Sequence, residues 1–224
     1  DYQGEGIMKG LLIKDLKLLK GQKNFFVVLI VIAIVLSVSM SSPSFVIGYM
    51  TFIGAVFTLS TISYDEFDNG NAFLFSLPVT RKDYVREKYV FGILVGGASC
   101  LLSIVISLVI GLINHSVFLP VIMMSAVMVF AVLFFIIAIM LPFQLKFGGE
   151  KGRVAIMIAF GVVILVGLLA AKIAGMFHID LGGMLSHFPV TNLGVMVAVI
   201  YALALSVCFL SMQISVAIME KKEF

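Results

Sequence analysis

Long apolar stretches fill this chain, and short polar or charged segments separate them. Six stretches contain no Asp, Glu, Lys or Arg and are bounded by charge, proline or polar clusters. They are Phe25–Met40, Phe45–Ile62, Val90–Ile113, Leu119–Leu141, Val154–Ala171 and Leu193–Met219. About 20 helical residues cross a hydrocarbon core of about 30 Å. The pattern therefore predicts an all-α membrane protein with six transmembrane helices.

Composition supports this prediction. Apolar residues make up 62% of the chain, charged residues only 12%, and the mean hydropathy is +1.19. These values are typical of an integral membrane protein and not of a soluble domain. We expect one six-span domain over residues 8–224. Residues 1–7, "DYQGEGI", resemble the remnant of a cloning tag, because they lack the basic and apolar regions of a signal peptide.

The positive charges predict the orientation of the chain in the membrane. Fourteen of the fifteen Lys and Arg residues fall in the N-terminal segment, the second and fourth connections, and the C-terminal tail. The opposite side carries only Lys172, which begins the outer segment 172–192. Because cytoplasmic loops retain positive charge, both termini are expected in the cytoplasm.

The basic segment 9–23 has a pattern of its own. Its leucines gather on one helical arc, whereas Lys14 and Lys17 lie on another. Such a helix can lie in the cytoplasmic membrane interface. A simple positive flank of the first span explains the pattern equally well.

Residue types that carry catalysis or bind metals are sparse. Cys100 and Cys208 fall inside predicted spans, where we expect them to pack as small apolar residues. The three histidines lie in outer connections and share no ligand spacing with an acid or thiol: His115, His178 and His187. No catalytic residue, metal site or disulfide is therefore predicted.

Missing features narrow the function further. No predicted span contains a charged residue or a histidine, whereas ion-coupled carriers need such groups at membrane depth. The chain has no G-x-x-x-x-G-K-[ST] loop, so any ATP hydrolysis is expected in another subunit. The one acidic cluster, Asp65, Glu66 and Asp68, is weak evidence for a membrane enzyme, which remains a third possibility.

The second connection, "YDEFDNGNAFLFSLPVTRKDYVREKY" at 64–89, contains an apolar run in the most charged part of the chain. Asn71 is expected to cap a short helix over Ala72–Leu77, and Pro78 to end it. Thr80 with Asp83 resembles a capping box for a helix that runs from Arg81 into the third span.

The side chains of the short helix suggest a docking role. Phe73, Leu74 and Leu77 have the i, i+1, i+4 spacing of a face that docks in a groove. On physical grounds alone the groove of a protein partner and the lipid interface explain this face equally well.

The outer segment 172–192, "KIAGMFHIDLGGMLSHFPVTN", contains glycines and a proline that break any single helix. Its apolar side chains favour re-entrant helices over a loop on the surface. Asp180 is expected on the outer side.

The connection, the basic N-terminal helix and the outer segment together resemble the permease subunits of type-2 ATP-binding-cassette exporters. The specific part is "DEFDNG" followed by "SLPVTRKDYVREKY", which is similar to the family's cytoplasmic coupling helix and its lead into the third span. Within the family, the chain is most similar to small bacterial permeases that export phenol-soluble modulins or bacteriocin peptides.

The resemblance implies a half-transporter in the bacterial plasma membrane. Two copies, or one copy and a close relative, would pair, and each coupling region would dock on a separate ATPase that binds ATP and Mg²⁺. The ATPase-coupling residues implied in this way are Asp65, Glu66, Gly70, Phe73, Leu74, Phe75, Leu77, Pro78 and Arg81. The expected cargo is an amphipathic peptide, the other contacts are membrane lipid, and no nucleic acid is involved. The alternative is a stand-alone membrane immunity or interaction protein without transport activity.

Overall fold

The computed structural model describes residues 2–39, 42–67, 70–114, 119–176 and 193–222. Every element within these ranges is an α-helix. The helices are α1 (Tyr2–Gly21), α2 (Lys23–Ser39), α3 (Pro43–Glu66), α4 (Gly70–Leu74), α5 (Arg81–Ile113), α6 (Leu119–Phe147), α7 (Gly149–Met176) and α9 (Leu193–Glu220). The predicted fold class is therefore confirmed as all-α.

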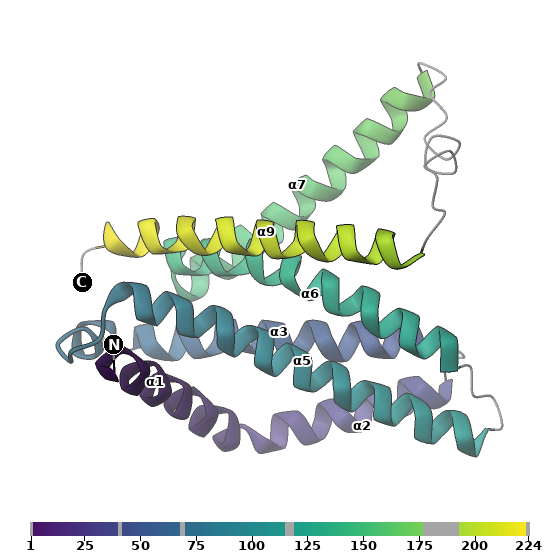
Figure 1. The fold of residues 1–224 in the computed structure, drawn as a ribbon, viewed down its shortest axis with the longest axis horizontal. Helices are drawn as coiled ribbons and strands as arrows, with labels where there is room; N and C mark the ends of the chain where they lie inside the picture. The colour runs from purple at the N-terminus through teal and green to yellow at the C-terminus, as the bar shows by residue number, and fades with distance from the viewer. Residues whose placement is uncertain (1, 40–41, 68–69, 115–118, 177–192, 223–224) are drawn as a thin grey trace.

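Four long helices form the centre of the protein. Helices α3, α5, α6 and α9 run alongside one another, α1 and α2 lie along one edge of this bundle, and α7 leaves it at an angle (Figure 1). The main core lies among the four central helices and includes Ile62, Tyr84, Leu133 and Met219. Cys100 and Cys208 are buried free thiols, as expected for packing residues.

Hydropathy supports several membrane spans. By length and composition, α3, α5, α6 and α9 can each cross a membrane. Helices α1 and α2 pass the same test as a pair, bent by 66°, which gives four or five candidate spans in the described chain. At 17 residues, α2 alone extends about 26 Å, less than the hydrocarbon core of about 30 Å. The count of six stays a prediction.

Local sequence signals explain the ends of several helices. Pro43 is the first residue of α3, where its missing N–H costs nothing. The Thr80 cap is confirmed, since its hydroxyl accepts from the backbone N–H of Asp83 at 3.1 Å. Helix α5 then continues unbroken to Ile113, as predicted. Gly148, with φ +78°, ends α6 in the left-handed conformation that glycine tolerates best.

The short helix α4 differs from the sequence prediction. It covers Gly70–Leu74, two residues earlier than expected at its start, and Asn71 lies inside it as a buried residue and does not cap it. Gly70 lies close to the backbone at the end of α3, because a β-carbon there would lie 2.7 Å from the backbone oxygen of Asp65. Between Leu74 and Pro78 the backbone forms turns with isolated hydrogen bonds.

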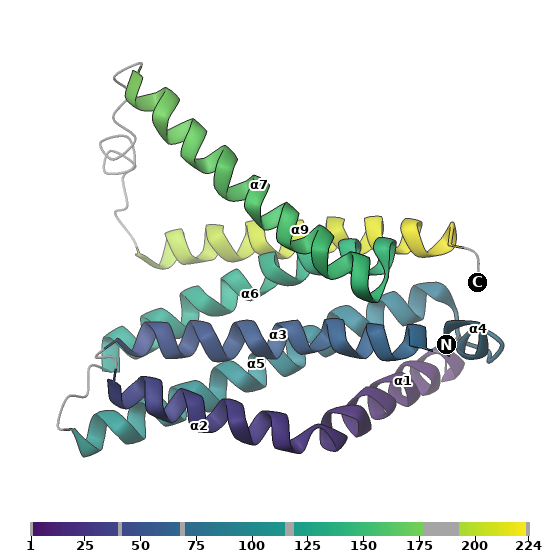
Figure 2. The ribbon, with the colours of Figure 1, turned by 180° about the vertical axis from the view of Figure 1, so that it is seen from behind.

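Both ends of the described chain lie near α4. Figure 2 shows that α1 begins, and α9 ends, at the same end of the bundle as α4. The predicted interfacial segment 9–23 is helical in α1 as far as Gly21, and the bend into α2 falls at its end. No feature of the structure tests its place in a membrane interface. The predicted outer segment, including Asp180, falls largely outside the described residues.

Candidate functional site

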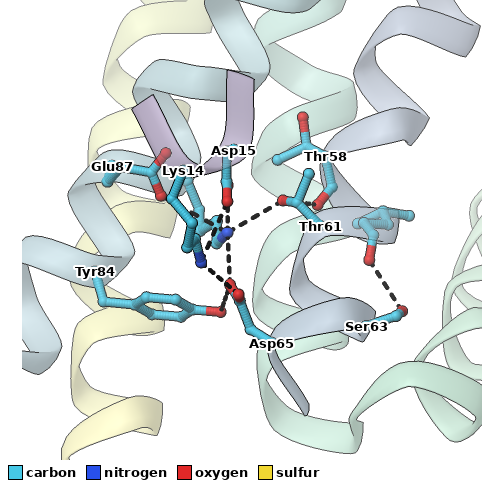
Figure 3. Close-up of polar contacts among 10 residues, drawn as sticks. Lys14, Asp15, Thr58, Thr61, Ser63, Asp65, Tyr84 and Glu87 are labelled. Atoms are coloured by element: carbon cyan, nitrogen blue, oxygen red, sulfur yellow. Dashed lines mark hydrogen bonds and ion pairs between the residues drawn. The ribbon is translucent and has the colours of Figure 1, made fainter. Parts of the chain in front are cut away.

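A cluster of buried charges joins three helices at the end of the bundle that carries α4. Figure 3 shows Lys14 and Asp15 of α1 facing Asp65 at the end of α3. The ammonium of Lys88, on α5, forms ion pairs with Asp15 and with Asp65, the latter at 2.8 Å. Lys14 pairs with the same two carboxylates, at 3.2 Å from Asp15 and at close range to Asp65. The cluster therefore binds α1, α3 and α5 together.

Burial of these charges costs hydration free energy. The side chains of Asp15, Glu87 and Lys88 are 0% exposed, and that of Asp65 is 8% exposed. Charges removed from water lose several kcal/mol of hydration each, which only close partners can offset. Breaking such a pair by removing one partner typically costs about 3–5 kcal/mol. The packing of α1 against α3 and α5 is therefore sensitive to each of these charges.

The cluster holds one more acid than base. Three carboxylates, from Asp15, Asp65 and Glu87, face the two ammonium groups of Lys14 and Lys88. Glu87 is the weakest partner, because its carboxylate lies 3.7 Å from the Lys88 ammonium and neither oxygen has a hydrogen bond. A charged Glu87 would thus give the cluster a surplus negative charge.

Neighbouring side chains hold the buried groups in place. The Thr61 hydroxyl accepts a hydrogen bond from Lys88 at 3.1 Å, and the Tyr84 hydroxyl donates to Asp65 at 3.1 Å. The Lys88 ammonium also lies 5.1 Å from the centre of the Tyr84 ring, within the range of a cation–π contact. Tyr84 therefore touches both charges of the Asp65–Lys88 pair.

Aromatic contacts extend from this cluster toward α4. The ring of Phe75 packs edge-on against that of Tyr84, with centres 5.6 Å apart. The Arg81 guanidinium lies 5.9 Å from the centre of the Phe75 ring. Leu74 and Phe75 pack against the main core, which includes Tyr84. The α4 loop and the charge cluster therefore both contact Tyr84 or its core neighbours.

A second set of polar contacts fixes the end of α9. Arg81 donates to the backbone oxygens of Met219 at 2.9 Å and Glu220 at 2.7 Å. These are carbonyls that the last turn of a helix leaves unpaired. Lys222 pairs with Glu66 at 2.9 Å, so the residues after α9 are connected to the end of α3.

Three apolar side chains near α4 project into the surroundings. Phe67 is 72% exposed, Phe73 is 71% exposed and Leu77 is 46% exposed. We call these residues the apolar knob. Leu74 is half-buried and packs against the main core, so it does not share the exposed face expected of it with Phe73 and Leu77.

The residues predicted for ATPase coupling therefore occupy different environments. Phe73, Leu77 and Pro78 are exposed, whereas Asp65 belongs to the buried charge cluster. Glu66 and Arg81 contact the end of α9 and the residues after it. Their role in coupling stays a prediction.

Sequence reasoning missed most of the charge cluster. Asp15 is the only acid in the basic segment 9–23, and this isolated opposite charge was the available signal. Glu87 and Lys88 gave no such signal, because the sequence places them among other charges at the start of a predicted helix. Within the described ranges, no group of three or more His, Cys, Asp or Glu side chains is arranged to hold a metal ion.

Comparison with known proteins assigns the chain to a family. A family model described as "ABC-2 family transporter protein" matches residues 10–220, nearly the whole chain. Comparisons with curated proteins and with solved structures return no match. Four apolar helices long enough to cross a membrane agree with such a multi-pass protein. This chain belongs to the ABC-2 family of transporter proteins.

Proposed function

We propose that this chain is the six-span permease half of an ATP-driven exporter in the bacterial plasma membrane, driven by a separate ATPase subunit. Family membership implies an ATP-binding-cassette ATPase partner in general. The observation that carries the proposal is the apolar knob, because it presents Phe67, Phe73 and Leu77 next to a firmly packed base.

The proposed topology places α4 and both termini in the cytoplasm. The described helices support it, since α1 begins and α9 ends at the end of the bundle that carries α4. Fourteen of the fifteen basic residues also fall in segments assigned to this side. Helices α2 and α7 supply the first and fifth spans in this proposal, with α1 along the cytoplasmic interface.

The proposed coupling contact is apolar at its centre. Phe73 and Leu77 would enter a groove on the ATPase, while Leu74 and Phe75 anchor the loop from below. Full burial of one such side chain contributes about 1.5–3 kcal/mol. Since the loop is joined to α5 through Arg81 and to the charge cluster through Tyr84, displacement of the knob would be transmitted to α1, α3 and α5.

The proposed assembly contains two permease chains, and its proposed cargo is an amphipathic peptide. One bundle of six helices is small to enclose a peptide pathway. Twenty phenylalanines and thirteen methionines supply adaptable apolar surface for such a cargo. Native mass spectrometry of the active complex should show two permease subunits, and a single active permease would contradict this part of the proposal.

Replacing Phe73 and Leu77 together by Asp tests the coupling contact. The variant should insert in the membrane normally, because neither residue lies in a candidate span. Losing two apolar contacts and burying carboxylates should weaken ATPase binding at least a hundredfold. The measurement is retention of the ATPase during purification, together with hydrolysis stimulated by the permease.

A matched control keeps the apolar character of the knob. Phe73→Leu with Leu77→Met should retain the ATPase, since similar apolar volume remains. An Asp variant that still retains and stimulates the ATPase would show that the knob lies in lipid. Failure of the unmodified chain to bind any ATPase would favour the stand-alone interaction protein.

A further inference from the structure

A groove runs along α3 on the side of the bundle away from α9. Its floor is α3, one wall is the bend between α1 and α2, and the other is the second turn of α7, which contributes Arg153. In Figure 2, helices α2, α3 and α7 lie toward the viewer, with α3 between α2 and the start of α7. The groove holds about 450 Å³.

The apolar and polar residues of the groove lie mostly at different ends of its floor, although Phe67 lines it beyond Tyr64. Ile53, Val56 and Phe57 form its apolar part, near the middle of α3. One turn further on lies Ser60, and another turn brings Tyr64, close to the charged end of the bundle. Phe25 extends the apolar part, its ring stacked on Phe57 with centres 6.4 Å apart.

Cations lie at the polar part of the groove. The amide of Gln22 donates to the Tyr64 hydroxyl at 2.5 Å, and this bonded pair borders both the groove and a second recess lined by Lys17. Within the described part of the chain, neither Arg153 nor Lys17 has a hydrogen bond or ion pair to another side chain. Two basic side chains, Arg153 and Lys17, therefore lie near the Gln22–Tyr64 pair.

The dimensions of the groove match one leaflet of a membrane. From Ile53 to Tyr64 the helix rises about 16 Å, close to half of a hydrocarbon core of about 30 Å. A peptide helix is about 10 Å wide with its side chains. A single acyl chain is much thinner than a helix and is compatible with this space.

We propose that this groove binds an anionic phospholipid, with its headgroup between Arg153 and Lys17 and an acyl chain along Phe25, Phe57 and Ile53. The two positive charges select an anionic headgroup, and the apolar floor contacts the acyl chain. The site requires only that this multi-pass protein is in a membrane, so the proposal stands apart from the export function.

The absence of tryptophan in the chain provides a direct test. Phe25→Trp places a single fluorophore in the groove, and brominated lipids quench it on contact. In reconstituted vesicles, brominated phosphatidylglycerol should quench at a lower mole fraction than brominated phosphatidylcholine. About fivefold is expected for each basic residue, thus up to about 25-fold for two. Ile53→Trp, in the apolar part of the groove, is a second reporter should the first variant fold poorly.

Control variants separate this site from general lipid contact. Val105→Trp, on an exposed part of α5, should show no preference between the two lipids. Arg153→Gln with Lys17→Gln should abolish the preference at position 25, whereas Lys9→Gln with Lys82→Gln should keep it. Equal quenching by both lipids, or a preference that survives loss of Arg153 and Lys17, would overturn the proposal.

An amphipathic peptide is the competing occupant in the same assay. Added to vesicles of phosphatidylcholine alone, such a peptide should not relieve quenching at position 25. Relief of quenching by the peptide, without any preference for phosphatidylglycerol, would assign the groove to peptide and refute the lipid site.

Discussion

Replacing Lys88 by methionine should release α1 from the bundle. Lys88 is fully buried and pairs with Asp15 of α1 and with Asp65 of α3. Methionine fills a similar volume but has no charge, so both carboxylates lose an ion-pair partner. When α1 detaches, Asp15 returns to water and this penalty disappears. The substitution therefore destabilises the docked position of α1 specifically.

The expected magnitude follows from the remaining contacts. Removing one partner of a buried ion pair costs about 3–5 kcal/mol. Lys14 stays paired with Asp65 and lies 3.2 Å from Asp15, so we take the lower limit, about 3 kcal/mol. This corresponds to a rise of about 150-fold in the detached population of α1.

Limited proteolysis with trypsin measures this population directly. Helix α1 contains Lys14, Lys17 and Lys20, and a docked helix resists cleavage. Where opening and closing are fast relative to cleavage, the cleavage rate follows the open population. Cleavage within α1 should accelerate about 150-fold in Lys88→Met, measured by intact-mass analysis of the purified chain.

Two variants serve as controls. Lys82→Met also removes one tryptic site from α5, but at an exposed position, and should leave cleavage of α1 unchanged. Asp15→Asn combined with Lys88→Met removes both partners and should recover part of the loss. Cleavage of Lys88→Met within twofold of the unmodified chain would refute the assignment of the charge cluster as the contact that holds α1.

The remaining predictions concern stability. Glu87→Gln removes the surplus carboxylate, which has no hydrogen bond, and should leave the melting temperature equal or higher, whereas a lower melting temperature would contradict our charge assignment. Gly54→Ala should destabilise the protein by about 1–3 kcal/mol, because its β-carbon would lie 2.3 Å from the hydroxyl oxygen of Ser99. Gly48→Ala, with nothing within 4 Å, should be neutral or stabilising in the same thermal melt, and equal effects of both would refute this packing argument.

The long helices could largely be predicted from the sequence. Charged residues, prolines and polar clusters mark their ends, so Ile113 and Leu119 were placed correctly as the end of α5 and the start of α6. The Thr80 cap could also be predicted, because its partner Asp83 lies three residues away. Such local signals need no knowledge of tertiary packing.

The charge cluster depended on packing that no local signal contains. Asp15 and Lys88 are 73 residues apart, and they meet only because α1 lies against α5. The predicted shared face of Phe73, Leu74 and Leu77 was wrong for a similar reason. Helical spacing predicted that Leu74 lies beside Phe73. In the structure Leu74 packs against the main core, whereas Phe73 is exposed.

The length of α5 has a mechanical consequence. Its 33 residues extend about 50 Å, and it approaches α6 closely near its middle, where a β-carbon on Gly96 would lie 2.5 Å from Leu133. We consider α5 as a rigid rod that tilts about this contact. A tilt of about 5° would move the Arg81 end and the Ile113 end by about 2 Å each, in opposite directions. A small sideways displacement at one membrane surface would thus appear as an equal and opposite displacement at the other.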